Sequence, residues 1–137
     1  MKLDPSAFVA APELIATLSQ HSLAIVCQED RILFRQGDQP EGVYVLQTGS
    51  ATLRMNAPDG HSIISLSLPA GSLLGVPGVV GNKPYTLTAI ARKGARLGYI
   101  SRSDFTALMH SEPLLSLKIL QVLAAEVSSA RRALVEM

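Results

Sequence analysis

The alternation of apolar and polar positions predicts a chain built mainly of short strands. Ala51, Leu53 and Met55 alternate with polar neighbours, and this period of two is typical of a strand with one buried face. The Asp59-Gly60 pair between two such runs tolerates positive φ and predicts a hairpin turn. We expect about eight short strands in all, and seven segments show a strand pattern: 22–28, 31–38 including its closing turn, 43–46, 50–55, 64–68, 86–91 and 95–100.

Helical spacing occurs at the two ends of the chain. Residues 12–19 begin with Pro12, which suits a first helical turn, and carry apolar side chains three and four apart. After the last strand, Ser101 or Ser103 is placed to cap a short amphipathic helix that contains Phe105. Antiparallel strands with helices grouped at the ends predict a jelly roll or β-roll flanked by helices.

A longer helix is expected from Pro113 to about residue 135, because this segment contains no further Gly or Pro. At 1.5 Å per residue it is roughly 30 Å long, more than a domain of this size covers. Spacings of three and four are typical of a coiled-coil seam and favour a homodimer through this C-terminal helix. A monomer with the helix packed on its own domain is the alternative. The seam residues are Leu117, Leu120, Ala124, Val127, Arg131 and Leu134.

Residues 71–86 form a glycine- and proline-rich stretch between two predicted strands, and the other predicted elements are arranged around it. Four glycines and two prolines lie in it, so we expect a loop rather than a helix. A loop buried against a sheet offers backbone N–H groups to a ligand, and Val76, Tyr85 and Thr86 are placed to line the same cavity. The alternative is a glycine-rich structural corner that binds nothing.

Composition narrows the classes of function. The 137 residues predict one domain (1–137), with the β-roll at about 20–101 and C-terminal helices at about 102–136. A net charge of +1 gives no basic face for nucleic acid. Cys27 is the single cysteine, which excludes an internal disulfide. We find neither a signal peptide nor an apolar run long enough for a membrane span, and we expect a cytoplasmic protein.

Catalytic and metal-binding patterns are weak. His21, His61 and His110 lie in separate elements without the spacing of metal ligands, and each is expected at the surface. We find no nucleophile elbow, P-loop or paired catalytic carboxylates. The sequence therefore predicts a protein that is not an enzyme and holds no metal or cofactor. A small cupin-like enzyme, which shares the double-sheet shape, stays an alternative.

Several motifs together resemble the cyclic-nucleotide-binding domain of Crp/Fnr regulators. The resemblance covers roughly residues 20–135 and implies a β-roll, a phosphate-binding cassette and a dimerising C-terminal helix. In that family the helix usually leads into a winged helix-turn-helix that binds DNA. Nothing in this chain predicts a recognition helix, so it is either a stand-alone module or part of a longer regulator. The matching motifs are residues 33–38, 43–49, Asp59-Gly60, 69–71 with Gly75, and Glu112-Pro113.

The cassette departs from the family pattern at its two charged positions. The family has a Gly-Glu pair before a short helix, whose Glu accepts from the ribose hydroxyl, and an Arg-Ser/Thr pair whose Arg neutralises the phosphate. Here Gly75 precedes Val76 and Pro77, and Tyr85 precedes Thr86. A buried phosphate without a cation is disfavoured, which weighs against cyclic AMP bound in the usual way.

The sequence thus predicts a homodimeric, ligand-sensing regulatory domain with an altered cassette. Lys83 lies near the cassette but would have to reach inward, and Arg131 is placed either to supply the missing charge or to face solvent beside the dimer seam. A dimerisation or interaction module that binds no nucleotide is the first alternative. The expected ligand-binding residues are Leu73, Gly75, Val76, Pro77, Tyr85, Thr86 and Arg131.

Overall fold

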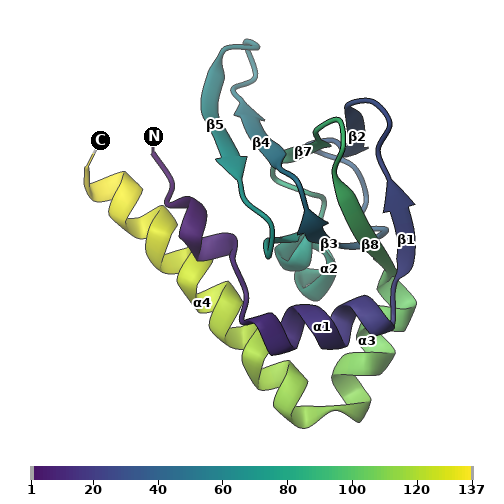
Figure 1. The fold of residues 1–137 in the computed structure, drawn as a ribbon. Coiled ribbons are helices and arrows are strands. Elements are labelled where there is room, and N and C mark those ends of the chain that lie inside the picture. The colour runs from purple at the N-terminus through teal and green to yellow at the C-terminus, as the bar shows by residue number, and fades with distance from the viewer. Residues whose placement is uncertain (1, 137) are drawn as a thin grey trace.

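The computed structural model describes residues 2–136 and consists of two facing four-stranded antiparallel sheets with helices at one side (Figure 1). The strand orders are β1-β8-β3-β6 and β2-β7-β4-β5. This architecture confirms the predicted β-roll with flanking helices. The strands are β1 (Leu23–Val26), β2 (Arg31–Phe34), β3 (Gly42–Thr48), β4 (Ala51–Asn56), β5 (Ser62–Leu68), β6 (Leu73–Leu74), β7 (Thr88–Ala91) and β8 (Arg96–Ser101).

The core lies on both sides of the sheet that contains β3. Side chains of alternate residues in a strand point to opposite faces. Leu46 and Leu97 face the other sheet and pack with Leu53 of β4, whereas Val43 and Val45 face the helices. Because β3 is covered on both faces, its sequence is a nearly continuous apolar run.

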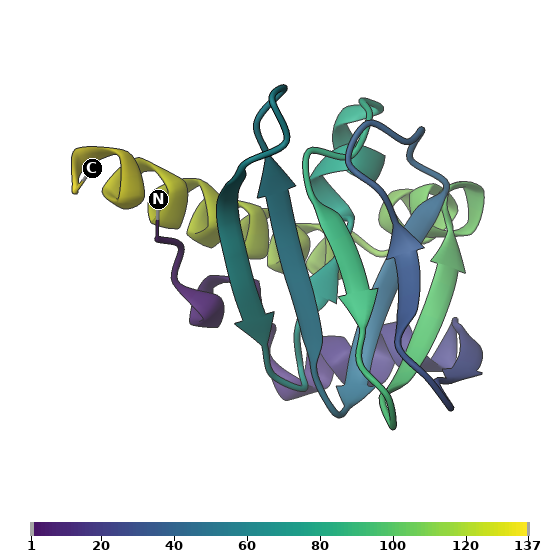
Figure 2. The same cartoon turned by 90° about the horizontal axis from the view of Figure 1, so that it is seen from above.

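The helices cover the outer face of this sheet, as Figure 2 shows from above. Ser101 caps α3, since its hydroxyl accepts from the backbone N–H of Asp104 at 3.2 Å, which confirms the predicted cap. Phe105 of α3 and Leu18 of α1 are fully buried against β3 and β8. The helices are η1 (Pro5–Phe8), α1 (Pro12–Gln20), α2 (Val76–Gly81), α3 (Arg102–Ser111) and α4 (Pro113–Val135).

Helix α4 is buried along one side only. Leu115, Ile119 and Val122 pack into the domain, and η1 runs beside the C-terminal half of α4 in both views (Figures 1 and 2). The Asp4 backbone N–H donates to the Ser129 hydroxyl at 2.8 Å and joins these two elements. Residues 4–8, which the pattern of apolar positions did not assign to an element, are therefore part of the packed structure.

The opposite side of α4 is exposed and apolar. In this helix, Leu117, Leu120, Val127 and Leu134 are each about half exposed or more. By length and composition α4 would also suffice to cross a membrane, whereas from the sequence we expected no apolar run of that length. Because core helices of water-soluble proteins pass the same test, this property alone is weak evidence for a membrane span.

The glycine- and proline-rich stretch contains a short helix, so the prediction of an uninterrupted loop is wrong. Helix α2 starts with Pro77 at its second position, where a missing N–H costs no intrahelical bond. Gly75 at φ 88° and Asn82 at φ 51° cap it in left-handed conformations. Gly75 and Asn82 thus limit the helix to about one and a half turns.

Candidate functional site

A cavity of about 60 Å³ lies beneath α2, where the two sheets meet η1 and α4. Its walls include five of the seven predicted ligand-binding residues: Leu73, Gly75, Pro77, Tyr85 and Thr86. The structure thus brings the two ends of the cassette together around one space. The remaining lining residues are Phe8, Phe34, Leu53, Leu74, Gly78, Leu87 and Glu126.

The other two predicted residues do not line this cavity. Val76 is fully buried, but it packs with Val79 in the cluster beneath the helices. Arg131 is exposed on α4 and, like Lys83, is not among the residues that line the cavity. No lysine or arginine lines the cavity among the residues that the structure describes.

Tyr85 occupies the centre of the site. Its ring stacks on Phe34, with centroids 3.9 Å apart and an angle of 18° between the planes. The Tyr85 hydroxyl donates to the carbonyl of Gly42 at 2.6 Å and accepts from the N–H of Gly42 at 3.1 Å. Burial raises the pKa of Tyr85, so the phenol stays neutral near physiological pH. This side chain therefore ties the cassette to the start of β3.

The Tyr85 ring also packs directly on two glycines of the cassette. A Cβ at Gly78 would lie 3.0 Å from Cδ1 of Tyr85, and one at Gly75 would lie 3.1 Å from Cε1. The ring thus fills the space beside these glycines. From the sequence we expect this position to correspond to the phosphate-neutralising Arg of the family cassette; in the structure an aromatic ring occupies it.

We expect Gly75→Ala to destabilise the domain by about 2–5 kcal/mol. Left-handed backbone costs about 1–2 kcal/mol for a residue with a Cβ, and overpacking adds about 1–3 kcal/mol. The new Cβ would lie 3.0 Å from the carbonyl oxygen of Gly42 and close to Tyr85. Gly60→Ala is the matched control, because Gly60 has φ 92° with nothing within 4 Å. If urea unfolding showed the same loss of unfolding free energy for both variants, the close packing of Gly42 and Tyr85 around Gly75 would be contradicted.

Glu126 is the functional candidate that sequence reasoning missed. It extends from α4 to the cavity, and its Oε2 is buried with no hydrogen-bond partner among residues 2–136. Burial alone raises the pKa of Glu126 to about 8, because the charged form loses its water. The sequence held one signal: Glu126 is the only charged residue between Lys118 and Arg131. Among residues 2–136, the cavity is therefore lined by one acidic side chain and by no lysine, arginine or histidine.

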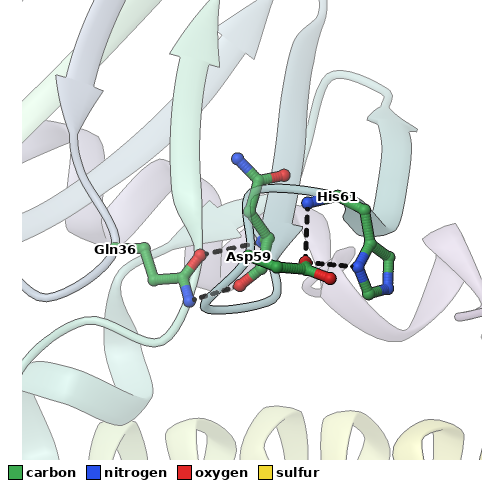
Figure 3. A network of polar contacts seen from close by, with 4 residues as sticks. Gln36, Asp59 and His61 are labelled. Atoms are coloured by element: carbon green, nitrogen blue, oxygen red, sulfur yellow. Dashed lines mark hydrogen bonds and ion pairs between the residues drawn. The ribbon is translucent and has the colours of Figure 1, made fainter.

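A second polar cluster lies at the tip of the β4–β5 hairpin (Figure 3). The Gln36 side chain donates to the carbonyl of Asn56 at 3.1 Å and accepts from its N–H at 3.0 Å. Asp59 accepts from the backbone and ring of His61, and these bonds lower the pKa of Asp59. Because all these bonds hold exposed backbone segments in place, we interpret the cluster as a support of the hairpin.

Metal-ligand geometry is not found among residues 2–136, which include no group of three His, Cys, Asp or Glu side chains close enough to share an ion. His21, His61 and His110 are exposed, as expected from the sequence.

Solved structures show where this fold occurs. The Thermus thermophilus catabolite activator protein is 23% identical with a TM-score of 0.78, over 96% of this chain and 62% of that chain. The N-terminal domain of a transcriptional regulator from Streptomyces coelicolor is 21% identical with a TM-score of 0.66, over 95% of this chain and 93% of that one. These likenesses establish the fold.

Sequence comparison gives a further relative and the family. Lysophospholipase nte1 of Neurospora crassa is 27% identical over 97 residues, which are 71% of this chain and 6% of that protein. The chain thus spans only a small part of that relative's length. Residues 24–112, which include the cassette and most of both sheets, match the cyclic nucleotide-binding domain. The chain therefore belongs to the cyclic nucleotide-binding domain family, with the β-roll found in Crp/Fnr regulators.

Proposed function

We propose that this protein is a ligand-sensing regulatory domain that works in the cytoplasm as a homodimer through α4. The family match and the fold shared with two transcription regulators support a regulatory role. Its phosphate-binding cassette is degenerate, since Val76 and Tyr85 stand where the family has Glu and Arg. We propose no catalytic activity.

The observation that carries the proposal is the double role of α4. Glu126 of this helix lines the cavity, and the next residue, Val127, belongs to the exposed apolar seam. A ligand that contacts Glu126 therefore acts on the same turn of helix that would meet a second copy. We infer that ligand binding shifts the two α4 helices relative to one another.

Size and charge argue against cyclic AMP in the usual position. About 10–15 Å³ holds one water and a 150 Å³ cavity holds benzene, so 60 Å³ is too small for a nucleotide unless the walls move. A phosphate would also meet the Glu126 carboxyl without a lysine or arginine in the described lining. The structure thus favours a smaller effector of a different charge.

We expect Leu120→Glu to convert a dimer into a monomer. Leu120 is 58% exposed in the isolated chain and lies at the middle of the seam. Burial of a leucine contributes about 1.5–3 kcal/mol, and two-fold symmetry applies the change twice. We therefore expect the dissociation constant to rise at least about 100-fold, as measured by sedimentation equilibrium with circular dichroism to check folding.

Leu23→Glu is the matched control for this experiment. Leu23 is 72% exposed on β1, away from α4, and receives the same new charge. This variant should remain a dimer with an unchanged dissociation constant. A wild-type chain that stays monomeric at high concentration, or equal dissociation constants for the wild type and Leu120→Glu, would refute dimerisation through α4.

A further inference from the structure

The chemistry of the cavity is amphipathic. Most of its wall is hydrocarbon, from Phe8, Phe34, Leu53 and their neighbours. Three of its lining residues carry side-chain oxygens: Glu126, Thr86 and Tyr85, whose hydroxyl is already bonded to Gly42. A molecule that fits these walls needs a small apolar body and one polar group.

The unpartnered oxygen of Glu126 specifies what that polar group is. A buried carboxylate without a partner is strongly disfavoured, and a cation beside it removes most of that penalty. No described lining residue supplies the cation, and Arg131 and Lys83 are exposed elsewhere. An ammonium group on a ligand would supply the charge and the hydrogen-bond donors that the protein lacks, whereas an anionic ligand would bring a buried charge for which no described lining residue supplies a cation.

We propose that this cavity binds a small, mainly apolar amine whose ammonium group pairs with the carboxyl of Glu126. This inference rests on the proposed ligand-sensing function and names the class of its effector. When a protonated Glu126 meets the ammonium ion, the carboxyl releases its proton to solvent and the ion pair forms. Because Glu126 lies beside the seam residue Val127, the amine occupies the point of α4 that adjoins the dimer interface.

Three probes of nearly equal size and different charge test the proposal: isobutylamine, isobutanol and isobutyrate. Each is titrated into the full chain, and backbone amide shifts of Gly75, Gly78 and Thr86 report occupation of the cavity. Ligands of so few atoms bind weakly, so we expect millimolar dissociation constants. Isobutylamine should bind at least tenfold more tightly than isobutyrate. Glu126→Gln should remove this preference.

Glu136→Gln is the control, because Glu136 is an exposed acid at the C-terminal end of α4 and its loss changes the net charge equally. It should retain the preference for the amine. Tighter binding of isobutyrate or of cyclic AMP at these amides, shifts confined to other residues, or no binding of any probe would each overturn the inference. The dimer measurement is independent of this test. If the protein is a dimer that does not bind the amine, this inference alone is refuted. If it is a monomer that binds the amine, only the dimeric mechanism is refuted.

Discussion

Glu126→Gln is expected to stabilise the protein by a few kcal/mol at pH 8.5 and to change its stability little at pH 4.5. The pKa of Glu126 is raised from 4.5 to about 8 by burial, so the folded protein keeps a proton that the unfolded chain loses in this range. Wild-type stability should therefore fall as pH rises from about 4.5 to about 8, by up to about 1.4 kcal/mol per pH unit. Glutamine, which resembles the protonated acid, has no such dependence.

The measurement is urea unfolding at pH 4.5, 6.5 and 8.5, with equal protein concentration because dimerisation adds to stability. Tyr85 is the other titratable side chain that lines the cavity, and its raised pKa keeps it neutral throughout this range. Asp4 and Asp59 have lowered pKa values in both proteins, so their effects cancel in the difference. Parallel stability curves for wild type and variant would show that Glu126 is not desolvated.

Tyr85→Ala is expected to destabilise the domain by about 3–5 kcal/mol, the range for removal of a large buried ring. The exposed fraction of Tyr85 is 4%, and the variant loses the stack on Phe34 together with both bonds to Gly42. Tyr44→Ala is the matched control, since Tyr44 is half-buried and donates one longer bond, of 3.3 Å, to Leu33. We expect Tyr44→Ala to lose clearly less unfolding free energy than Tyr85→Ala in the same urea assay.

Tyr85→Phe separates the ring from the hydroxyl. It keeps the stack on Phe34 but leaves the N–H and carbonyl of Gly42 without their side-chain partner. A buried polar group that loses its partner costs about 1–3 kcal/mol, so this variant should lie between wild type and Tyr85→Ala. If Tyr85→Ala proved as stable as Tyr44→Ala, the ring would not be a central support of the cassette.

The sequence determined seven of the eight strands, the long helix and the family of this protein, but it missed β6, which lies in the stretch expected to be a loop. Apolar residues recur every two positions along a strand and every three to four along a helix, because one face of each element is buried. This pattern can be recognised within a short stretch of sequence. Ser101 and Pro113 marked the starts of the last two helices for the same reason, because caps act within one turn. Gly75, Tyr85 and Thr86 were also expected from the sequence to line one cavity, and they do; their role in binding stays a prediction.

Tertiary structure alone decided which side chains line the cavity besides the cassette residues. Helix α2 forms although it contains Pro77 and glycines, because Val76, Gly78 and Val79 are buried in the domain and the Tyr85 ring packs on Gly78, which local propensity does not report. Glu126, rather than Arg131, meets the cavity because the packing of α4 sets its rotation. Five residues turn a helix by about 140° and advance it by about 7.5 Å. A sequence pattern defines the apolar side of a helix, but only its contacts with η1 and the sheets fix which residue faces a small site.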